Sequence, residues 1–265
     1  MKLTLIITTY NWPESLLLVM ESINCQTIFP DEVIIADDGS TKETRVLINS
    51  FNIKSNIKAI YSWQEDVGFR AARSRNKAIF QSSGDYIVLI DGDTILHTKF
   101  IEDHIANSES GYFVQGSRSL LTEKQTRKAL ANKIINFSFF SLELMNRKNS
   151  IHSKLLSLIF SNKKNHMSGI KSCNMAFYKN DCININGFNN EFEGWGREDS
   201  EFVVRLINSG VKRKNVRFNA IQFHLWHNEN SRLSLKKNDV ILDNAIKKGI
   251  QWCENGINSI EENEN

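Results

Sequence analysis

Short β-rich runs alternate with segments that carry helix signals over residues 1–115, and this alternation is the strongest constraint on the fold. The runs rich in β-branched and apolar residues are Leu3 to Thr9, Glu32 to Ala36, Ile57 to Ser62 and Tyr86 to Ile90. The helix signals lie between them, at Glu14 to Ile23, Val46 to Phe51 and Ala71 to Phe80. Alternating strands and helices form βαβ units. The sequence therefore predicts an α/β fold with a mainly parallel sheet flanked by helices.

Local signals mark the start of two of these helices. Pro13 fits the first turn of the first helix, because a proline there has no N–H to leave unpaired. Ser40 and Glu43 have the spacing of a capping box just before the second helix. We therefore expect both helices to begin at these signals.

Polar groups follow three of the predicted strands where each strand ends. Thr8 to Asn11, Asp37 to Ser40 and Asp91-Gly92-Asp93 occupy these positions. Open α/β sheets bind their ligands at this edge of the sheet. Two carboxylates around a flexible glycine suit a divalent metal that carries a diphosphate. Asp and Gly are also common in ordinary turns, so Asp-Gly-Asp alone is a weak signal.

The order and spacing of five sequence blocks resemble those of family 2 glycosyltransferases, which have the GT-A fold. The blocks are Ile6 to Asn11, Ala36 to Ser40, Gly68 to Asn76, Asp91 to Asp93, and Gly187-Phe188 with Gly194 to Asp199. The last block looks like the Trp-Gly-x-Glu-Asp segment of chondroitin-polymerase and galactosyltransferase catalytic domains. The chain as a whole is similar to bacterial enzymes that extend lipooligosaccharide cores.

This resemblance implies an inverting, metal-dependent transfer of a hexose from a UDP-sugar to a hydroxyl of a bacterial surface glycan. Glucose and a lipooligosaccharide core are the leading candidates, and an N-acetylhexosaminyl- or galactosyltransferase for capsule is the alternative. Two other classes stay open: a nucleotidyltransferase and a catalytically silent glycan-binding protein. A nucleotidyltransferase would have a glycine-rich loop and a lysine near its N-terminus, and residues Ile6 to Trp12 have neither. A catalytically silent protein would have lost a metal or base residue, but Asp91, Asp93 and Asp199 are all present.

The resemblance places the nucleotide-sugar site at Thr8, Tyr10, Asp37, Asp38, Arg70, Arg75, Asn76 and Asp91. In this interpretation Tyr10 stacks on the pyrimidine, and either Asp37 or Asp38 accepts hydrogen bonds from the base or ribose. The alternative for these acids is turn chemistry at a strand end. Arg70 and Arg75 lie at a helix entrance, where cations and free N–H groups can meet phosphates.

A metal site is expected around Asp93, with Mn²⁺ or Mg²⁺ as the cofactor. By resemblance, a histidine after a late strand completes such a site, and His224 and His227 follow the predicted strand Ala220 to Phe223. We favour His224, with His227 as the alternative. Both imidazoles have a second interpretation as satisfied side chains at an aromatic strand end.

Glu198 and Asp199 are the candidate catalytic residues, at the start of a predicted helix from Ser200 to Asn208. In the related enzymes the aspartate is the general base and the glutamate binds the acceptor. The remaining acceptor-binding candidates are Trp195, Gly196 and Arg197. Arg197 stands where chondroitin-polymerase-like domains often carry glycine, so it can recharge the acceptor pocket. The structural alternative is a helix-end charge pair beside a core tryptophan.

We expect one catalytic domain over residues 1–230, since 265 residues with 41% hydrophobic content can bury a sizeable core. Residues 1–115 form its nucleotide-sugar half and residues 116–230 its acceptor half, with a basic helical insertion at about 123–165. Residues 231–265 are expected to form a helix, Val240 to Ile250, and a polar tail that frays from Glu254.

The insertion has nine cations and one acid, Glu143, between its first and last lysine. The cations are Lys124, Arg127, Lys128, Lys133, Arg147, Lys148, Lys154, Lys163 and Lys164. Apolar residues lie among them, so the segment is either a solvated insertion whose aromatics pack on the sheet or a contact surface for an anionic membrane. The second interpretation fits a lipid-linked acceptor.

Nucleic acid is not an expected partner, because the isoelectric point near 8.6 is too low and no nucleic-acid motif is present. Four cysteines without C-x-x-C spacing fit reduced thiols better than disulfides. A strand begins within two residues of Met1, which leaves no room for a signal peptide. We therefore expect a cytoplasmic protein, with the inner face of the cytoplasmic membrane as the place of any membrane contact.

Overall fold

A computed structural model describes residues 1–229 and 231–260, and its centre is a seven-stranded sheet. The strand order is β10-β6-β9-β4-β1-β2-β3. These strands are β1 (Leu3–Thr9), β2 (Glu32–Asp37), β3 (Ala59–Trp63), β4 (Tyr86–Asp91), β6 (Tyr112–Gln115), β9 (Asn174–Tyr178) and β10 (Lys212–Asn215). β1 to β4 are mutually parallel, while β9 runs antiparallel between β4 and β6. The predicted α/β fold with a mainly parallel sheet is confirmed.

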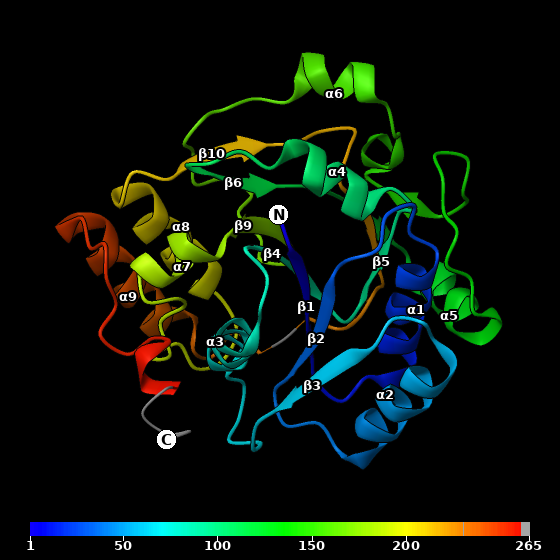
Figure 1. The fold of residues 1–265 in the computed structure, drawn as a ribbon, viewed down its shortest axis with the longest axis horizontal. Coiled ribbons are helices and arrows are strands. Elements are labelled where there is room, and N and C mark those ends of the chain that lie inside the picture. The colour runs from blue at the N-terminus through cyan, green and yellow to red at the C-terminus, as the bar shows by residue number, and fades with distance from the viewer. Residues whose placement is uncertain (230, 261–265) are drawn as a thin grey trace.

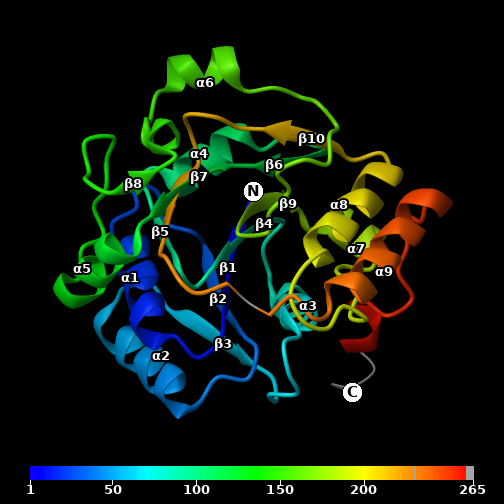
Figure 2. The same ribbon diagram turned by 180° about the vertical axis from the view of Figure 1, so that it is seen from behind.

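Helices cover both faces of the sheet (Figures 1 and 2). They are α1 (Pro13–Asn24), α2 (Lys42–Lys54), α3 (Ala71–Gln81), α4 (Phe100–Asn107), α7 (Lys179–Asn184), α8 (Glu198–Asn208) and α9 (Leu235–Lys248). Successive side chains of a strand point to opposite faces. Leu5 and Ile7 of β1 therefore pack with α1, α2 and α4, while Ile6 packs with α3, α7 and α8. A strand buried on both faces is uniformly apolar, which explains the continuous runs in the sequence.

A smaller four-stranded sheet lies beside the end of β4. It includes a strand from the late part of the chain, which therefore lies close to that end. Its order is β5-β11-β7-β8, with β5 (Thr94–Leu96), β11 (Ile221–His224), β7 (Ser117–Leu121) and β8 (Leu144–Met145). His224 pairs with Thr94, and the backbone N of Leu225 donates to the carbonyl of Asp93 at 2.9 Å. This sheet brings residues 221–225 next to Asp93.

The helix start at Pro13 is confirmed, and the capping box at Ser40 is wrong. Thr41 is the N-cap of α2, and its side chain accepts no capping hydrogen bond. The Ser40 hydroxyl instead accepts from the backbone N of Asn11 at 2.8 Å, joining the turns after β1 and β2. A tertiary contact therefore replaces the local one.

The insertion at 123–165 is helical at its two ends and irregular between them. α5 (Glu123–Asn132) and α6 (Lys154–Phe160) are helices, but β8 and a 3₁₀ turn, η1 (Arg147–Ser150), lie between. Phe137 is 7% exposed and its ring lies 5.4 Å from that of Phe223. The prediction of a helical insertion is therefore wrong for its centre, which adds a strand to the small sheet and a side chain to its core.

The chain after α9 packs against the domain through residue 260, so the predicted fraying from Glu254 is wrong for these residues. Ile257 and Ile260 are 4% and 2% exposed, and the backbone N of Ile257 donates to the carbonyl of Asn186. The rest of the predicted polar tail, 261–265, and residue 230 lie outside the described residues. Within the described ranges, none of the helices has the length and apolar character that crossing a membrane requires.

Candidate active site

Asp93, His224 and His227 converge at the junction of the two sheets. One ligand atom from each lies within 4.8 Å of the others. The Nε2 atoms of His224 and His227 lie 3.6 and 3.3 Å from Oδ2 of Asp93. The sequence left the choice between the two histidines open, and the structure brings both to the same carboxylate.

The second carboxylate oxygen of Asp93 has the character of an open ligand position. Asp93 Oδ1 is buried and has no hydrogen-bond partner among the described residues. A buried carboxylate oxygen without a partner is costly, and a bound cation removes that cost. One carboxylate and two imidazoles form a donor set for a divalent transition metal. The residues therefore fit the expected metal.

The two histidines also set the charge of Asp93. Burial acts to raise the pKa of Asp93, but His224 and His227 outweigh it, so the pKa is lowered. The hydrogen bond to Asp93 raises the pKa of His227 to about 9. Burial lowers the pKa of His224 despite the same carboxylate. The cluster therefore keeps Asp93 ionised, as a metal ligand must be.

Arg75 joins the two halves of the site. Its side chain is 5% exposed, and Nη1 lies 3.1 Å from Oε1 of Glu198 while Nη2 lies 3.5 Å from Oδ1 of Asp91. Its Nε donates to the hydroxyl of Thr8 at 3.2 Å. One buried guanidinium therefore ties β1 and the end of β4 to the first turn of α8. The roles of Thr8, Arg75 and Asp91 in nucleotide-sugar binding stay predictions.

Asp199 lies in the first turn of α8 and has an unusual proton affinity. Burial and the negative charge of Glu198 together raise the pKa of Asp199 to about 7, although Arg75 opposes both. Its Oδ1 accepts from the backbone N of Ser200 at 2.6 Å. A carboxylate with this pKa can accept a proton near neutral pH, which is what a general base requires.

The turn before α8 depends on its glycines and on Arg197. Gly194, Gly196 and Arg197 all have positive φ, at 72°, 104° and 78°. A Cβ on Gly194 would lie 2.3 Å from the hydroxyl of Ser234, so only glycine lets this turn meet the start of α9. The backbone at Arg197 then directs α8 so that Glu198 and Asp199 face the site.

Arg197 and Trp195 make contacts that the sequence did not predict. Nε of Arg197 donates to Asp239 of α9 at 2.6 Å, so this side chain is held by α9 rather than by Glu198. The role of Arg197 in the acceptor pocket stays a prediction. Trp195 is 39% exposed, with the guanidinium of Arg232 5.9 Å from its ring. Acceptor binding by Trp195, Gly196 and Glu198 stays a prediction.

Asp37 and Asp38 are both buried, and both oxygens of each carboxylate accept hydrogen bonds from protein groups. Asp37 is fully buried, and its two oxygens accept from the backbone N of Ser40 and the hydroxyl of Tyr61. These contacts hold Asp37 in the turn after β2. Asp38 accepts from the backbone N of Arg70 at 2.7 Å, and burial raises its pKa to about 6. Its other oxygen accepts from Nε2 of Gln64 at 2.6 Å, so a nucleotide contact of either acid stays a prediction.

Asn76 is a structural residue. It is fully buried, its Nδ2 donates to the carbonyl of Phe188 at 2.7 Å, and its Oδ1 accepts from the backbone N of Phe188 at 2.8 Å. The prediction that Asn76 binds the nucleotide sugar is wrong, because both ends of its amide hold the Gly187-Phe188 turn against α3.

Tyr10 and Arg70 border the predicted nucleotide side of the site. Tyr10 is 49% exposed, which leaves its ring free to stack, and its hydroxyl donates to Asp66 at 2.9 Å. Arg70 pairs with Glu193 at 3.0 Å, which spans from the start of α3 to the turn before α8. The sequence did not predict Asp66 as the partner of Tyr10. Its position in the loop between β3 and α3 is the one sequence feature that could have indicated it.

Solved structures define the fold as that of GT-A glycosyltransferases. S. aureus TarS, residues 1–349, superposes with a TM-score of 0.64 at 16% identity, covering 96% of this chain and 66% of that one. Mannosyltransferase PcManGT from Pyrobaculum calidifontis, solved with GDP-Man and Mn²⁺, superposes with a TM-score of 0.57 at 15% identity, covering 84% and 56%. At such identities the likeness concerns the fold alone.

Sequence comparisons give the family. The model described as "Glycosyl transferase family 2" matches residues 4–173, and that described as "N-terminal domain of galactosyltransferase" matches residues 156–228. The chain belongs to glycosyl transferase family 2. Chondroitin synthase from Escherichia coli is 25% identical over 84% of this chain and 34% of its own length. Hyaluronan synthase from Pasteurella multocida is 29% identical over 81% and 24%. The chain thus spans about a quarter to a third of these relatives.

Proposed function

We propose that the protein is an inverting, metal-dependent glycosyltransferase that moves a hexose from a UDP-sugar to a hydroxyl of a bacterial surface glycan. The observation that carries the proposal is the convergence of Asp93, His224 and His227 beside Asp91, which Arg75 links to the acids of α8. Asp93 and the α8 acids are more than a hundred positions apart in the sequence. A shared site for them has no structural need, whereas sugar transfer needs both.

Asp93, His224 and His227 are the residues that would hold the metal. When bound, a divalent metal neutralises the charge that builds on a leaving diphosphate. Two imidazoles beside one carboxylate favour Mn²⁺ over Mg²⁺, which prefers oxygen ligands. PcManGT was solved with GDP-Man and Mn²⁺, and TarS with UDP, which supports a nucleotide-sugar donor for this chain.

Asp199 is the proposed general base. An acceptor hydroxyl is a weak nucleophile, and it gains strength as Asp199 takes its proton. The hydroxyl oxygen forms a bond to the anomeric carbon while the bond from that carbon to the diphosphate oxygen breaks. A single displacement of this kind inverts the anomeric centre. Protonated Asp199 then returns the proton to solvent after the nucleoside diphosphate leaves.

Arg75 and Glu198 position this chemistry. Arg75 pairs with both Asp91 and Glu198, so its single positive charge offsets part of the negative charge that these two partly buried acids bring to the site. Glu198 is 12% exposed through its side chain and is the proposed ligand of an acceptor hydroxyl. Tyr10 and Asp38 are the proposed contacts of the base and ribose.

Glucose is the proposed sugar and a lipooligosaccharide core the proposed acceptor. A glucosyltransferase is also among the relatives: validoxylamine A glucosyltransferase from Streptomyces hygroscopicus is 25% identical over 79% of this chain and 48% of its own length. N-acetylhexosaminyl or galactosyl transfer to capsule is the alternative.

The test is a screen of labelled UDP-sugars with Mn²⁺ and a truncated core glycan, in which UDP and pyrophosphate are both quantified. The proposal predicts UDP release with a sugar joined to the glycan in inverted configuration. Pyrophosphate release would indicate a nucleotidyltransferase, and glycan binding without any release would indicate a silent glycan-binding protein.

The face of α6 supports the proposed contact with an anionic membrane. Leu155, Leu158 and Ile159 are 68%, 84% and 63% exposed, while Ser157 on the other face is buried. This reverses the usual arrangement, in which the apolar face of a helix points inward. Lys154 lies on the same short helix and is largely exposed. Figure 1 shows α6 at the margin of the molecule, where a flat lipid surface can reach it. Exposed apolar groups with neighbouring cations match an anionic lipid bilayer.

Flotation with anionic and with neutral liposomes tests this contact. We expect binding to anionic vesicles at low salt that is lost in Leu158→Ser with Ile159→Ser. Val240→Ser, which changes a 69% exposed apolar residue on α9, is the matched control and should still float. Equal flotation of both variants, or none by the unmodified protein, would contradict the contact.

A further inference from the structure

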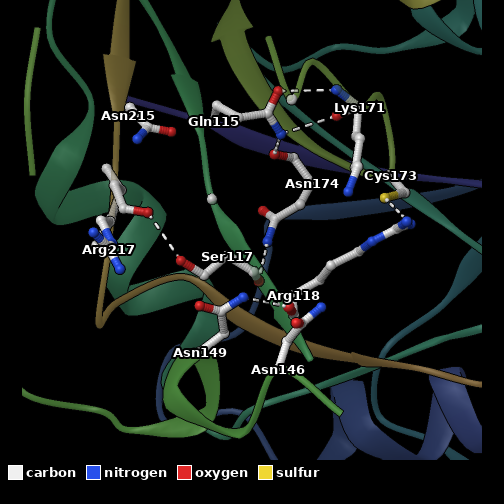
Figure 3. Close-up of a pocket in the computed structure, with 13 residues that line it drawn as sticks. Gln115, Ser117, Arg118, Asn146, Asn149, Lys171, Cys173, Asn174, Asn215 and Arg217 are labelled. Carbon is white, nitrogen blue, oxygen red and sulfur yellow. Dashed lines mark hydrogen bonds between the residues drawn. The ribbon is translucent and has the colours of Figure 1, made fainter. Parts of the chain in front are cut away.

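A polar pocket of about 270 Å³ includes Arg118, which interacts electrostatically with Asp93 and His224 of the candidate metal site. Its walls come from the end of β6, from β7, from the start of β9, from Asn146 and η1, and from residues 169–173 and 215–217 (Figure 3). Asn174 of its wall pairs with Ile90, the residue before Asp91. In the sheet, β4 separates β9 from β1 and β2, which carry the predicted nucleotide residues. The pocket therefore lies on the acceptor side of Asp91.

The pocket wall is fixed by buried amides. Asn174 is 1% exposed, and its Nδ2 donates to the carbonyls of Ser117 and Ala220. Gln115 donates to the carbonyl of Lys171 at 3.0 Å and accepts from its backbone N at 3.1 Å. These hydrogen bonds hold the backbone on both sides of the pocket. The backbone of the charged residues in its wall is therefore held in place.

The pocket wall has three cations: Arg118, Lys171 and Arg217, of which Arg217 is exposed. Arg118 and Lys171 take part in none of the ion pairs of the described residues, and none of the residues lining the pocket is acidic. The buried Nε of Arg118 has no hydrogen-bond partner there, and its Nη1 reaches only the sulfur of Cys173, at 3.4 Å. A buried guanidinium nitrogen without a partner is costly unless a ligand supplies an acceptor.

Arg118 and Lys171 also lie within electrostatic range of the candidate reacting groups. Arg118 interacts electrostatically with Asp91 and Asp93, and Lys171 with Asp199. Figure 3 shows the side chains of Arg118 and Lys171 on the same side of the pocket. An anion held by them would be part of a molecule whose neighbouring hydroxyl can reach Asp199.

We propose that this pocket, which we call the Arg118 pocket, binds an anionic group of the acceptor, a carboxylate or a phosphate. Arginine binds both groups through paired N–H donors, and a nearby ammonium adds charge. The inference rests on the proposed function, and it narrows the acceptor from any surface glycan to an acidic or phosphate-bearing one.

Equilibrium dialysis of three labelled sugars against the full chain with UDP and Mn²⁺ tests the pocket. The probes are glucuronic acid, glucose 6-phosphate and neutral glucose. At least one anionic probe should bind about tenfold or more tightly than glucose, the gain expected from charged hydrogen bonds. The stronger of the two anionic probes identifies carboxylate or phosphate as the natural group.

Variants locate the effect. Arg118→Gln with Lys171→Gln should lose the preference for the anion and keep its affinity for UDP. Lys128→Gln, at an exposed lysine of α5, should change neither quantity. Equal binding of all three sugars by the unmodified protein would overturn the proposal, as would an anion preference that survives in the double variant. A matching loss of UDP affinity in that variant would assign both cations to the donor instead.

The same experiment separates this inference from the proposed function. Dialysis of UDP with Mn²⁺ alone reads the donor site, and dialysis of the anionic sugar without UDP reads the pocket. Failure of UDP to bind contradicts the proposed function even if the sugar preference is present. Normal UDP binding without any sugar preference contradicts the Arg118 pocket alone.

Discussion

The two ends of the site shift the pKa of a carboxyl group in opposite directions. At the metal end, two histidines outweigh burial and lower the pKa of Asp93. At the α8 end, burial and Glu198 together raise the pKa of Asp199 to about 7. Partners rather than burial decide the difference, because both side chains lie in the interior of the site. One acid is therefore suited to stay ionised as a ligand, and the other to exchange a proton.

The largest expected effect is the loss of the proton acceptor at the α8 end. Asp199→Asn should lower sugar transfer by about 10² to 10⁴, the range for removal of a general base, because asparagine cannot take the hydroxyl proton. Steady-state UDP release in the presence of acceptor measures it. Asp243→Asn, at an exposed acid of α9, is the control and should transfer at the unmodified rate. Full activity of Asp199→Asn would show that Asp199 is not the general base.

Arg75 links the two ends of the site, and its removal should lower the free energy of unfolding. Arg75→Gln leaves Asp91 and Glu198 close together without their shared cation, which should cost about 3 kcal/mol of unfolding free energy. Urea denaturation measures this change. Arg73→Gln, which loses one hydrogen bond to Gln64, should cost less than about 1 kcal/mol. Equal stability of the two variants would show that Arg75 does not join the halves.

The smallest expected effect is in the pH profile. Asp199 must be ionised to accept a proton, so kcat/KM at saturating Mn²⁺ should rise with pH and level off above about 7, the pKa that burial gives it. Below that pH the rate should fall about tenfold per unit. The inflection should disappear from the residual activity of Asp199→Asn. An inflection that stays in this variant would belong to another group.

The fold could be predicted because its signals are local. The strand Leu3–Thr9 has the predicted bounds, and α3 begins at Ala71 as predicted, since apolar runs and helix signals are readable within a few residues. Ser40 shows the limit of such signals. Its hydroxyl binds Asn11, which is distant in sequence, and no local rule weighs that contact against a capping box.

The site could be predicted where its residues fall in recognisable blocks, and not where they depend on partners. Asp93 was predicted from its block at the end of a strand and the two histidines from the resemblance, and the small sheet brings all three together. Asn76 and Asp37 belong to the same blocks but are buried by protein partners. Arg118 and Lys171 were missed, because a strand arginine and a loop lysine belong to no block. Their common pocket exists only after residues 115–118 and 169–174 meet.

In the proposed mechanism, Asp93 has the role of metal ligand and Asp199 that of general base. Calorimetric titration of UDP in the presence of Mn²⁺ tests this assignment most directly. Asp199→Asn should bind UDP as the unmodified protein does, because the proposed role of Asp199 is on the acceptor and not on the donor. Asp93→Ala should bind it about tenfold or more weakly, since its metal ligand is lost. Mn²⁺-dependent UDP binding of unchanged strength in Asp93→Ala would contradict the account.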